Sequence, residues 1–374
     1  MRLRQEFGLM KRRLSGGKTV WYYWIYDDRN RRIYRSTGQK TKAKALEYVL
    51  SLRDSGTLGG KDRCMVLLRD FCKDFFIPGK CPIERNATLR GKSMKKSTLS
   101  VRRTALCEHI LPHLGGYPVS GINRRVINQW LMDLPEKDKI SRTTSNAAKV
   151  ALSLVMAEAV RQALVPSNPC EKVENLGSDT TRRKAFTLDE VHRIIGKPED
   201  WQNPLIRLMC LISATTGMRI GEVRALKRDC ITDSSIIIKA SFNNEDGYTL
   251  PKNGKTRIAP IPPSLRDEIL AVTPPDDSFI FCMLKDKPMS SDWVKKCLAK
   301  RMKALGISGK TFHGFREFFN TQMMSANVNE TVVRAVMGHS KADMTERYLH
   351  VETAEFRQIR SAQLSLMDSI TSFA

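Results

Sequence analysis

Two polar stretches that contain glycine divide this 374-residue chain into three parts. The first, residues 55–60, holds three glycines beside Ser, Thr and Leu, and the second, residues 175–184, combines one glycine with three basic residues. Such segments are typical of linkers, because they have little apolar surface to bury. A chain of this length also exceeds what one hydrophobic core usually supports. The sequence therefore predicts a multidomain protein with domains at 1–58, 62–170 and 180–374.

The first part has the pattern of a small α+β domain. Residues 18–26 are dense in aromatic and β-branched side chains, and a polar turn separates them from a second run at 32–35. This pattern predicts a β-hairpin. Apolar residues recur at helical spacing over 42–53, which predicts a helix. The clustered Trp and Tyr side chains could stack on bases, but in so small a sheet we expect most of them in the core.

The second part is helical throughout and predicts a four-helix bundle, with helices near 66–75, 99–114, 122–131 and 147–164. A basic loop before the second helix and a hydroxyl-rich start of the fourth suit a phosphate backbone. For Ser141 or Thr144 alone, an ordinary helix N-cap is an equally good interpretation. The candidate DNA-binding residues are Lys92, Lys95, Lys96, Ser141, Arg142, Thr144 and, in the second linker, Arg182 and Arg183.

The third part is expected to be mainly α with one small antiparallel sheet. The capping-box pattern from Thr187 to Glu190 predicts a helix over 188–195, followed by helices over 204–216 and from about 220. Short strands are expected at 235–239, 247–250 and 257–261, after which helices resume to the end of the chain. The last apolar-patterned stretch, 354–370, could pack on its own domain or on a neighbouring protomer. The predicted fold class is mainly α with small β-sheets.

Positive charge is concentrated in the first two parts. The chain has 63 basic and 39 acidic side chains, and residues 1–178 carry 34 and 16 of them, which leaves +18 of the net +24 there. A surplus of this size predicts a polyanionic partner, nucleic acid before membrane. No apolar run reaches the ~18 residues of a membrane span and the N-terminus lacks a signal-peptide core, so we expect a cytoplasmic protein.

The nine cysteines indicate neither a zinc site nor a disulfide framework. Their number is odd and no two of them form a C-x-x-C pair. Cys64 and Cys72 lie on the apolar face of an expected helix, so buried free thiols in a reducing cytosol are predicted.

Three short segments of the third part hold the side chains that phosphodiester cleavage needs. They are 216–222 with Arg219, 313–316 with His313 and Arg316, and Gly338-His339 followed nine residues later by Tyr348. Arginine forks bind phosphate oxygens, imidazole transfers protons near neutral pH, and a phenol can form a covalent phosphotyrosine. Each residue alone has a commoner structural explanation. Together they predict a site that attacks DNA without a metal or a diffusible cofactor.

These motifs resemble the tyrosine recombinases, the phage-integrase type of site-specific DNA recombinase. The resemblance is close from about 185 to 350 and only one of pattern over 62–168. It implies that Arg219 and Arg316 clamp the phosphate, that His313 and His339 take the paired histidine positions, and that Tyr348 is the nucleophile.

Two further residues follow from the same resemblance. The family's catalytic lysine lies on a turn between two strands, where Lys252 fits best and Lys255 is its rival. Glu222 matches an acidic position that orients the site, although a carboxylate in the first turn of a helix has a structural explanation as well.

The resemblance implies an integrase that cuts and rejoins double-stranded DNA through a 3′-phosphotyrosine and a Holliday junction, and so integrates or excises a phage or mobile element. Residues 1–58 look like an arm-type DNA-binding domain. A homotetramer on DNA and accessory DNA-bending or excision proteins are the implied partners, without a membrane. The alternatives are a dimer resolvase of the same family, a type IB topoisomerase-like relaxing enzyme and a non-catalytic DNA-binding protein.

Overall fold

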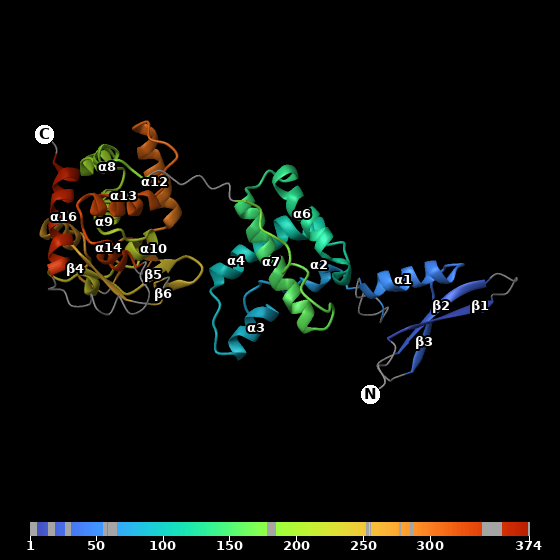
Figure 1. Ribbon diagram of the computed structural model, residues 1–374. Helices are drawn as coiled ribbons and strands as arrows, with labels where there is room; N and C mark the ends of the chain where they lie inside the picture. The colour runs from blue at the N-terminus through green and yellow to red at the C-terminus, as the bar shows by residue number, and fades with distance from the viewer. Residues whose placement is uncertain are drawn as a thin grey trace. The chain divides into compact units, whose positions relative to one another are not determined.

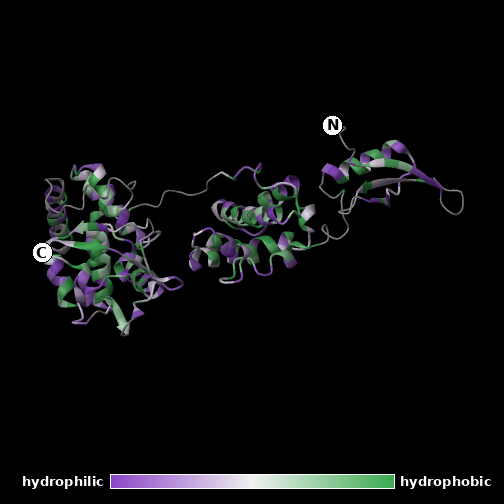
Figure 2. Ribbon diagram, turned by 90° about the horizontal axis from the view of Figure 1, so that it is seen from below, coloured by the Kyte–Doolittle hydropathy of each residue, from purple (hydrophilic) through white to green (hydrophobic). Residues whose placement is uncertain are grey.

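The computed structural model describes residues 6–13, 19–26, 31–54, 58, 66–177, 185–251, 254, 256–276, 278–284, 287–338 and 354–372 (Figure 1). The chain divides into two compact units, Met1–Thr180 and Thr181–Ala374. Hydrophilic and hydrophobic residues alternate along most ribbons of both units (Figure 2). Amphipathic elements of this kind bury one face and leave the other to solvent.

A three-stranded antiparallel sheet begins the first unit. Its order is β1 (Gly8–Arg13), β2 (Thr19–Tyr26) and β3 (Arg32–Ser36), and helix α1 (Lys42–Asp54) packs on one face. The predicted hairpin and helix are confirmed. Strand β1 was not predicted, because its sequence has no aromatic or β-branched residue and gains its place by pairing with β2.

The aromatic residues of β2 divide between the two faces of this sheet. Tyr23 and Ile25 are buried against Val49 of α1, whereas Tyr22, Trp24 and Tyr26 alternate with them and stay partly exposed. The expectation that most of these rings lie in the core was wrong, since strand periodicity sends every second side chain to the uncovered face.

Helices make up the rest of the first unit: α2 (Leu68–Phe71), α3 (Pro82–Leu89), α4 (Lys96–Ala105), a π-helical turn (Leu106–Ile110), α5 (Leu111–Leu114), α6 (Arg124–Lys137) and α7 (Arg142–Arg161). Three of the four expected helices are present, the one over 99–114 being built from α4, the π-helical turn and α5. The expected first helix is only the single turn α2, which ends at Phe71 and is followed by turns over 72–76. The backbone then takes positive φ values at Phe76 (59°) and Gly79 (77°), which prevent the helix from resuming there. Helix α3 was not predicted.

The second unit is mainly helical, with α8 (Leu188–Ile195), α9 (Pro204–Thr216), α10 (Ile220–Arg224), α11 (Pro263–Ala271), α12 (Ser291–Ala304), α13 (His313–Ser325), α14 (Glu330–Met337) and α16 (Ala354–Thr371). The predicted capping box is formed, as the Thr187 hydroxyl accepts from Glu190 N–H and the Glu190 carboxylate from Thr187 N–H. The predicted fold class, mainly α with small antiparallel sheets, is confirmed.

The strands of this unit differ from the single sheet that was expected. The described residues form three separate antiparallel ladders: β4 (Ser235–Ile238) with β7 (Arg257–Pro260), β5 (Ser241–Asn243) with β6 (Gly247–Thr249), and β8 (Cys282–Leu284) with β9 (Lys287–Pro288). Strands β5, β8 and β9 are two or three residues long, too short for an alternating pattern to be visible in the sequence.

Helix α16 packs on its own unit. Ile359, Met367 and Ile370 are buried in the same core as α9. The Gln363 amide donates to Thr215 O at 2.8 Å and to Pro260 O at 2.9 Å, so the last helix ties α9 to β7. The sequence left open whether this helix packs on its own domain or on a neighbouring protomer. The structure shows it packed on its own domain.

Cys72 is buried and free, and burial raises the pKa of its thiol to about 12. Cys64, the other cysteine expected to be buried and free, lies outside the described residues.

No helix in the described part of the chain is long and apolar enough to cross a membrane.

Candidate active site

Gly217 forms the turn that leads from α9 into α10. It ends α9 in the left-handed conformation with φ 68°, and its N–H donates to Ser213 O at 3.0 Å. A Cβ atom here would lie 2.7 Å from the Phe319 ring of α13. Glycine therefore allows both the left-handed turn and the close approach of α13.

Arg219 and Glu222 occupy the start of α10. The Glu222 carboxylate accepts from the Arg219 backbone N–H at 2.8 Å and from Arg219 Nη1 at 3.0 Å. The Glu222 side chain is 1% exposed, whereas that of Arg219 is 26% exposed. The buried carboxylate thus orients an arginine that still reaches the surface.

Arg316 of α13 joins the three sequence motifs. Its Nη1 donates to Gly217 O at 2.5 Å and its Nη2 donates to Met337 O, at the end of α14. Its side chain is buried. A guanidinium group has five N–H donors, so Arg316 can bind more acceptors than these two carbonyls.

Burial lowers the pKa of Arg316 to about 9, and the nearby positive charge of Arg219 acts in the same direction, as does Arg257. At neutral pH the guanidinium stays charged. Positive groups that repel one another this closely favour an anion in the site, because an added negative charge relieves both the repulsion and the lost hydration.

Arg257, in β7, is a residue of this site that the sequence reasoning did not single out. Its Nη1 and Nη2 donate to Glu222 Oε1 at 3.0 Å and Oε2 at 2.6 Å, and its Nε donates to Val336 O at 2.7 Å. The available signal was an arginine at the start of a strand that continues with apolar residues, a position that buries its charge and calls for a partner.

Burial raises the pKa of the Glu222 carboxyl, but the charge and hydrogen bonds of Arg257, with those of Arg219, outweigh burial and hold this pKa below its ordinary value. Glu222 is therefore ionised at neutral pH and binds both arginines.

His313 opens α13 and lies three residues before Arg316, which places both on one side of the helix. Its side chain is half-exposed, and its Nε2 lies 3.4 Å from Glu317 Oε1. A Cβ atom at the next residue, Gly314, would lie 2.7 Å from the Phe186 ring. The first turn of α13 is thus pressed against Phe186, and His313 remains accessible.

Several predicted site residues lie outside the described part of the chain: Lys252, Lys255, His339, Tyr348, Arg182 and Arg183. Described residues close in sequence to Lys252 and His339 lie near Arg316. Strand β7 with Arg257 begins five residues after Lys252, and Gly338, with φ 71°, follows the Met337 carbonyl that Arg316 binds.

The remaining DNA-binding candidates are exposed and belong to the first unit. Lys92 lies in the loop before α4, Lys95 is the N-cap of α4 and Lys96 is its first residue. Ser141 is the N-cap of α7, and its hydroxyl accepts from Thr144 N–H at 3.0 Å. The structural interpretation of Ser141 is therefore correct, and its exposure, like that of Arg142, leaves it accessible.

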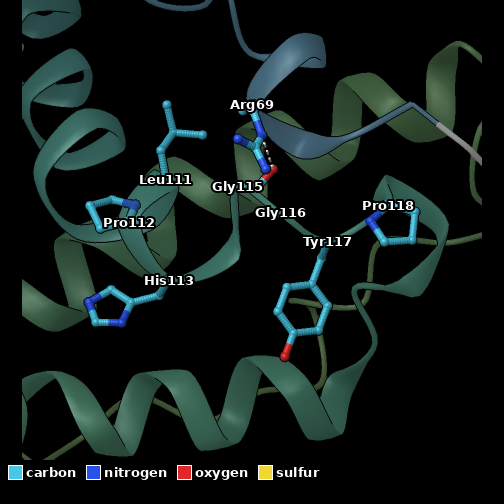
Figure 3. A pocket seen from close by; sticks show the side chains of 8 residues that line it. All are labelled: Arg69, Leu111, Pro112, His113, Gly115, Gly116, Tyr117 and Pro118. Carbon is cyan, nitrogen blue, oxygen red and sulfur yellow. Dashed lines mark hydrogen bonds between the residues drawn. The ribbon is translucent and has the colours of Figure 1, made fainter.

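A cavity of about 530 Å³ in the first unit contains none of the motif residues (Figure 3). Arg69, His113 and Tyr117 line it, and His113 Nε2 lies 2.9 Å from Asp138 Oδ2. Within the described residues, no group of His, Cys, Asp and Glu side chains could hold a metal ion. The convergence of Arg219, Glu222, Arg257 and Arg316 is the candidate active site.

Comparisons with known proteins cover the part of the chain that contains this site. Residues 184–355 match the model of the phage integrase family. The chain is 24% identical over 254 residues to tyrosine recombinase XerC of Lactobacillus leichmannii, covering 65% of this chain and 85% of that protein.

Solved structures share the fold. One is a lambda integrase dimer bound to a COC′ core site, with TM-score 0.60, 18% identity and coverage of 93% of this chain and 96% of that one. Another is the Tn1549 transposon integrase with circular intermediate DNA, with TM-score 0.57, 20% identity and coverage of 75% and 97%. Residues 184–355 are thus similar to the phage integrase family, and the chain shares its fold with these two integrases.

Proposed function

We propose that this protein is a site-specific DNA integrase that cuts and rejoins double-stranded DNA through a 3′-phosphotyrosine at Tyr348. The observation that carries the proposal is the position of Arg316, which binds the carbonyls of Gly217 and Met337 and so brings the three motifs to one place. Arg219, partly exposed beside it, is the first contact for a scissile phosphate.

In the proposed reaction the Tyr348 oxygen attacks phosphorus, and the bond to the 5′ oxygen breaks. His313 or His339 takes the phenol proton, and Lys252 gives a proton to the leaving 5′ oxygen. Arg219 and Arg316 balance the charge of the phosphorane, a contribution whose loss typically slows such reactions about 100- to 1000-fold. Attack by the 5′ hydroxyl of a partner strand reverses these steps, restores the diester and frees Tyr348.

A suicide substrate tests this function. A duplex nicked close to the cleavage point loses the short 5′-hydroxyl fragment and traps the covalent adduct. Wild-type protein is expected to form an adduct that protease digestion maps to Tyr348. Tyr348→Phe should bind the same DNA and form none. An adduct that survives in Tyr348→Phe, or none in the wild type, would contradict the proposal.

The uncovered face of the N-terminal sheet supports an arm-site role for residues 1–58. On this face the Arg32 guanidinium carbon lies 4.3 Å from the Trp24 ring centroid, and Tyr34 is exposed beside them. Aromatic rings and cations together suit DNA backbone and base contact. The helical residues 62–170 are proposed to bind the core site through Lys92, Lys95, Lys96, Ser141, Arg142 and Thr144, and the linker to contribute Arg182 and Arg183.

Binding at a second, flanking DNA site separates an integrase from a resolvase. Trp24→Ala with Arg32→Ala should weaken binding to DNA that contains both sites and leave binding to the core site alone unchanged. Tyr48→Ala, an exposed aromatic on α1, is the control that should change neither. Equal loss on both DNAs would argue against an arm-site role. Efficient relaxation of plasmids that lack any recombination site would favour the topoisomerase-like alternative.

A further inference from the structure

Arg257 joins three segments that the proposed reaction needs to hold together: its own strand β7 and helices α10 and α14. It lies in β7, five residues after Lys252, and its fork binds both oxygens of Glu222 at 3.0 Å and 2.6 Å. Glu222 in turn binds Arg219. The third contact, from Nε to Val336 O at 2.7 Å, fixes the end of α14 just before Gly338 and His339.

The ion pair between Arg257 and Glu222 is buried, unlike an incidental ion pair on the surface. Arg257 is 4% exposed and Glu222 is 2% exposed, so both charges have lost most of their hydration. Gly338 packs on the side chain as well, since a Cβ atom there would lie 3.1 Å from Arg257 Cδ. A buried bidentate pair of this kind resists rotation of either side chain, because any other geometry leaves a charge unpaired.

We propose that Arg257 is a positioning residue for catalysis: acting through Glu222 it orients Arg219, and through Val336 it holds the end of α14, which precedes His339 in the sequence. The proposal rests on the proposed function of the site. Arg257 does not itself touch DNA. All three of its guanidinium nitrogens bind protein acceptors and its side chain is only 4% exposed, whereas Arg219, the other arginine that Glu222 holds, is 26% exposed.

Removal of Arg257 changes the charge state of the site as well as its shape. The charged groups among the described residues that face Glu222 are Arg219 before α10, Arg257 of β7 and Arg316 of α13. Burial raises the pKa of Glu222, and the charge of Arg257 is the main effect that lowers it. Without Arg257 the pKa of Glu222 therefore rises. A protonated Glu222 holds Arg219 less well, so the variant should lose activity as the pH falls and recover part of it as the pH rises.

The test is single-turnover cleavage of the suicide substrate by the full chain, measured from acid to alkaline pH. Arg257→Met is expected to cleave about 10- to 100-fold more slowly near neutral pH, as is typical when a residue that supports a catalytic group is lost. DNA affinity should stay at the wild-type level. Arg257→Lys keeps the charge but not the fork, so it should be slower than wild type with an unaltered pH profile.

Arg207 provides a matched control. It is a buried arginine of α9 that also binds one carboxylate, Glu268 at 2.5 Å, and one carbonyl, Gly196 O at 3.1 Å, away from the motifs. Arg207→Met should lower the melting temperature as Arg257→Met does while cleaving at the wild-type rate once folded. A double-mutant cycle of Glu222→Gln with Arg257→Met should be strongly non-additive.

Three results would overturn the inference. The first is that folded Arg257→Met cleaves at the wild-type rate. The second is that its cleavage rate falls by no more than that of Arg207→Met and does so equally at every pH, and the third is that the effects of Glu222→Gln and Arg257→Met on the rate are additive. If Arg257→Met does not fold, wild-type cleavage by Arg257→Lys would overturn it equally, since the fork would then be dispensable. Failure of the wild type to form any adduct would instead refute the proposed function, and the inference with it.

Discussion

Some positions in the motifs accept only one residue type. At Gly217 only glycine fits both the left-handed turn and the close approach of Phe319. Gly217→Ala must place a Cβ in a left-handed turn and 2.7 Å from the Phe319 ring. The left-handed backbone alone costs about 1–2 kcal/mol for a residue with a Cβ. We expect a larger loss of unfolding free energy by denaturant titration, and slower DNA cleavage, because the Gly217 carbonyl holds Arg316.

Gly306→Ala is the matched comparison. Gly306 has φ 71°, but a Cβ atom there meets nothing within 4 Å. The Gly306→Ala variant should therefore lose only the part of the unfolding free energy that the left-handed backbone costs, and it should cleave DNA at the wild-type rate. Equal losses in the two variants would show that the contact with Phe319 is unimportant.

The Glu222 carboxylate should make stability depend on pH at acid values. Its folded-state pKa lies below the ordinary carboxyl value of 4.5, so its stabilisation is fully present above that value and is lost as the pH falls through the lowered pKa. Glu222→Gln leaves Arg257 buried without its charge partner and should cost about 3–5 kcal/mol at neutral pH. Its melting temperature should also decline less steeply between neutral and acid pH than that of the wild type. A parallel decline in both proteins would contradict the assignment.

At the scale of whole elements, α16 covers part of the core of the second unit. Ile359 is 0% exposed in the shared core, whereas Leu364 on the same helix is 39% exposed. Ile359→Ala should lower the unfolding free energy by about 2–5 kcal/mol, and Leu364→Ala by much less. If the helix packs within its own chain in solution, this difference will not change with protein concentration. A concentration-dependent loss would instead indicate docking on a second protomer.

Arg224 shows how a short helix fixes a short hairpin. Its guanidinium is buried and donates to Met289 O at 2.6 Å, Phe242 O at 3.2 Å and Asn244 Oδ1 at 2.7 Å, which attaches β5–β6 to α10. Arg224→Met should leave these acceptors unsatisfied and cost about 1–3 kcal/mol each at most. Hydrogen exchange should quicken at 241–249 more than in α9, and unchanged exchange there would contradict this attachment.

Helices α8 and α9 were predictable to the residue, and strands β4, β6 and β7 were predictable to within one residue. Strands β1, β5, β8 and β9 were not predicted. Helices α8 and α9 begin and end where capping residues, glycine and apolar periodicity placed them. Strands β1 and β5 carry no comparable local signal and exist because a neighbouring strand pairs with them. Likewise the division of the β2 aromatics between two faces became visible only once α1 was seen to cover one of them.

At the scale of the whole molecule, charge should govern DNA affinity. Residues 1–178 carry most of the excess positive charge, and neutralised phosphates release counterions, so affinity should fall steeply as salt rises. Replacing Lys92, Lys95 and Lys96 by Gln should reduce the slope of log affinity against log salt by about one for each phosphate that these lysines neutralise. The same change at the exposed Lys296, Lys300 and Lys303 of α12 is the control of equal charge. Equal slopes for both triple variants would contradict a specific role for the loop before α4.

The sequence by itself determined the mainly helical fold class and three motifs that point to phosphodiester chemistry, because turn residues, caps and catalytic side-chain types are local properties. Only the tertiary structure decided how those motifs are held together. Arg257 is one arginine among many in a basic chain until folding removes water from it and leaves Glu222 and Val336 O as its partners. Burial and contact between residues far apart in the chain are what turn an unremarkable strand residue into part of the site.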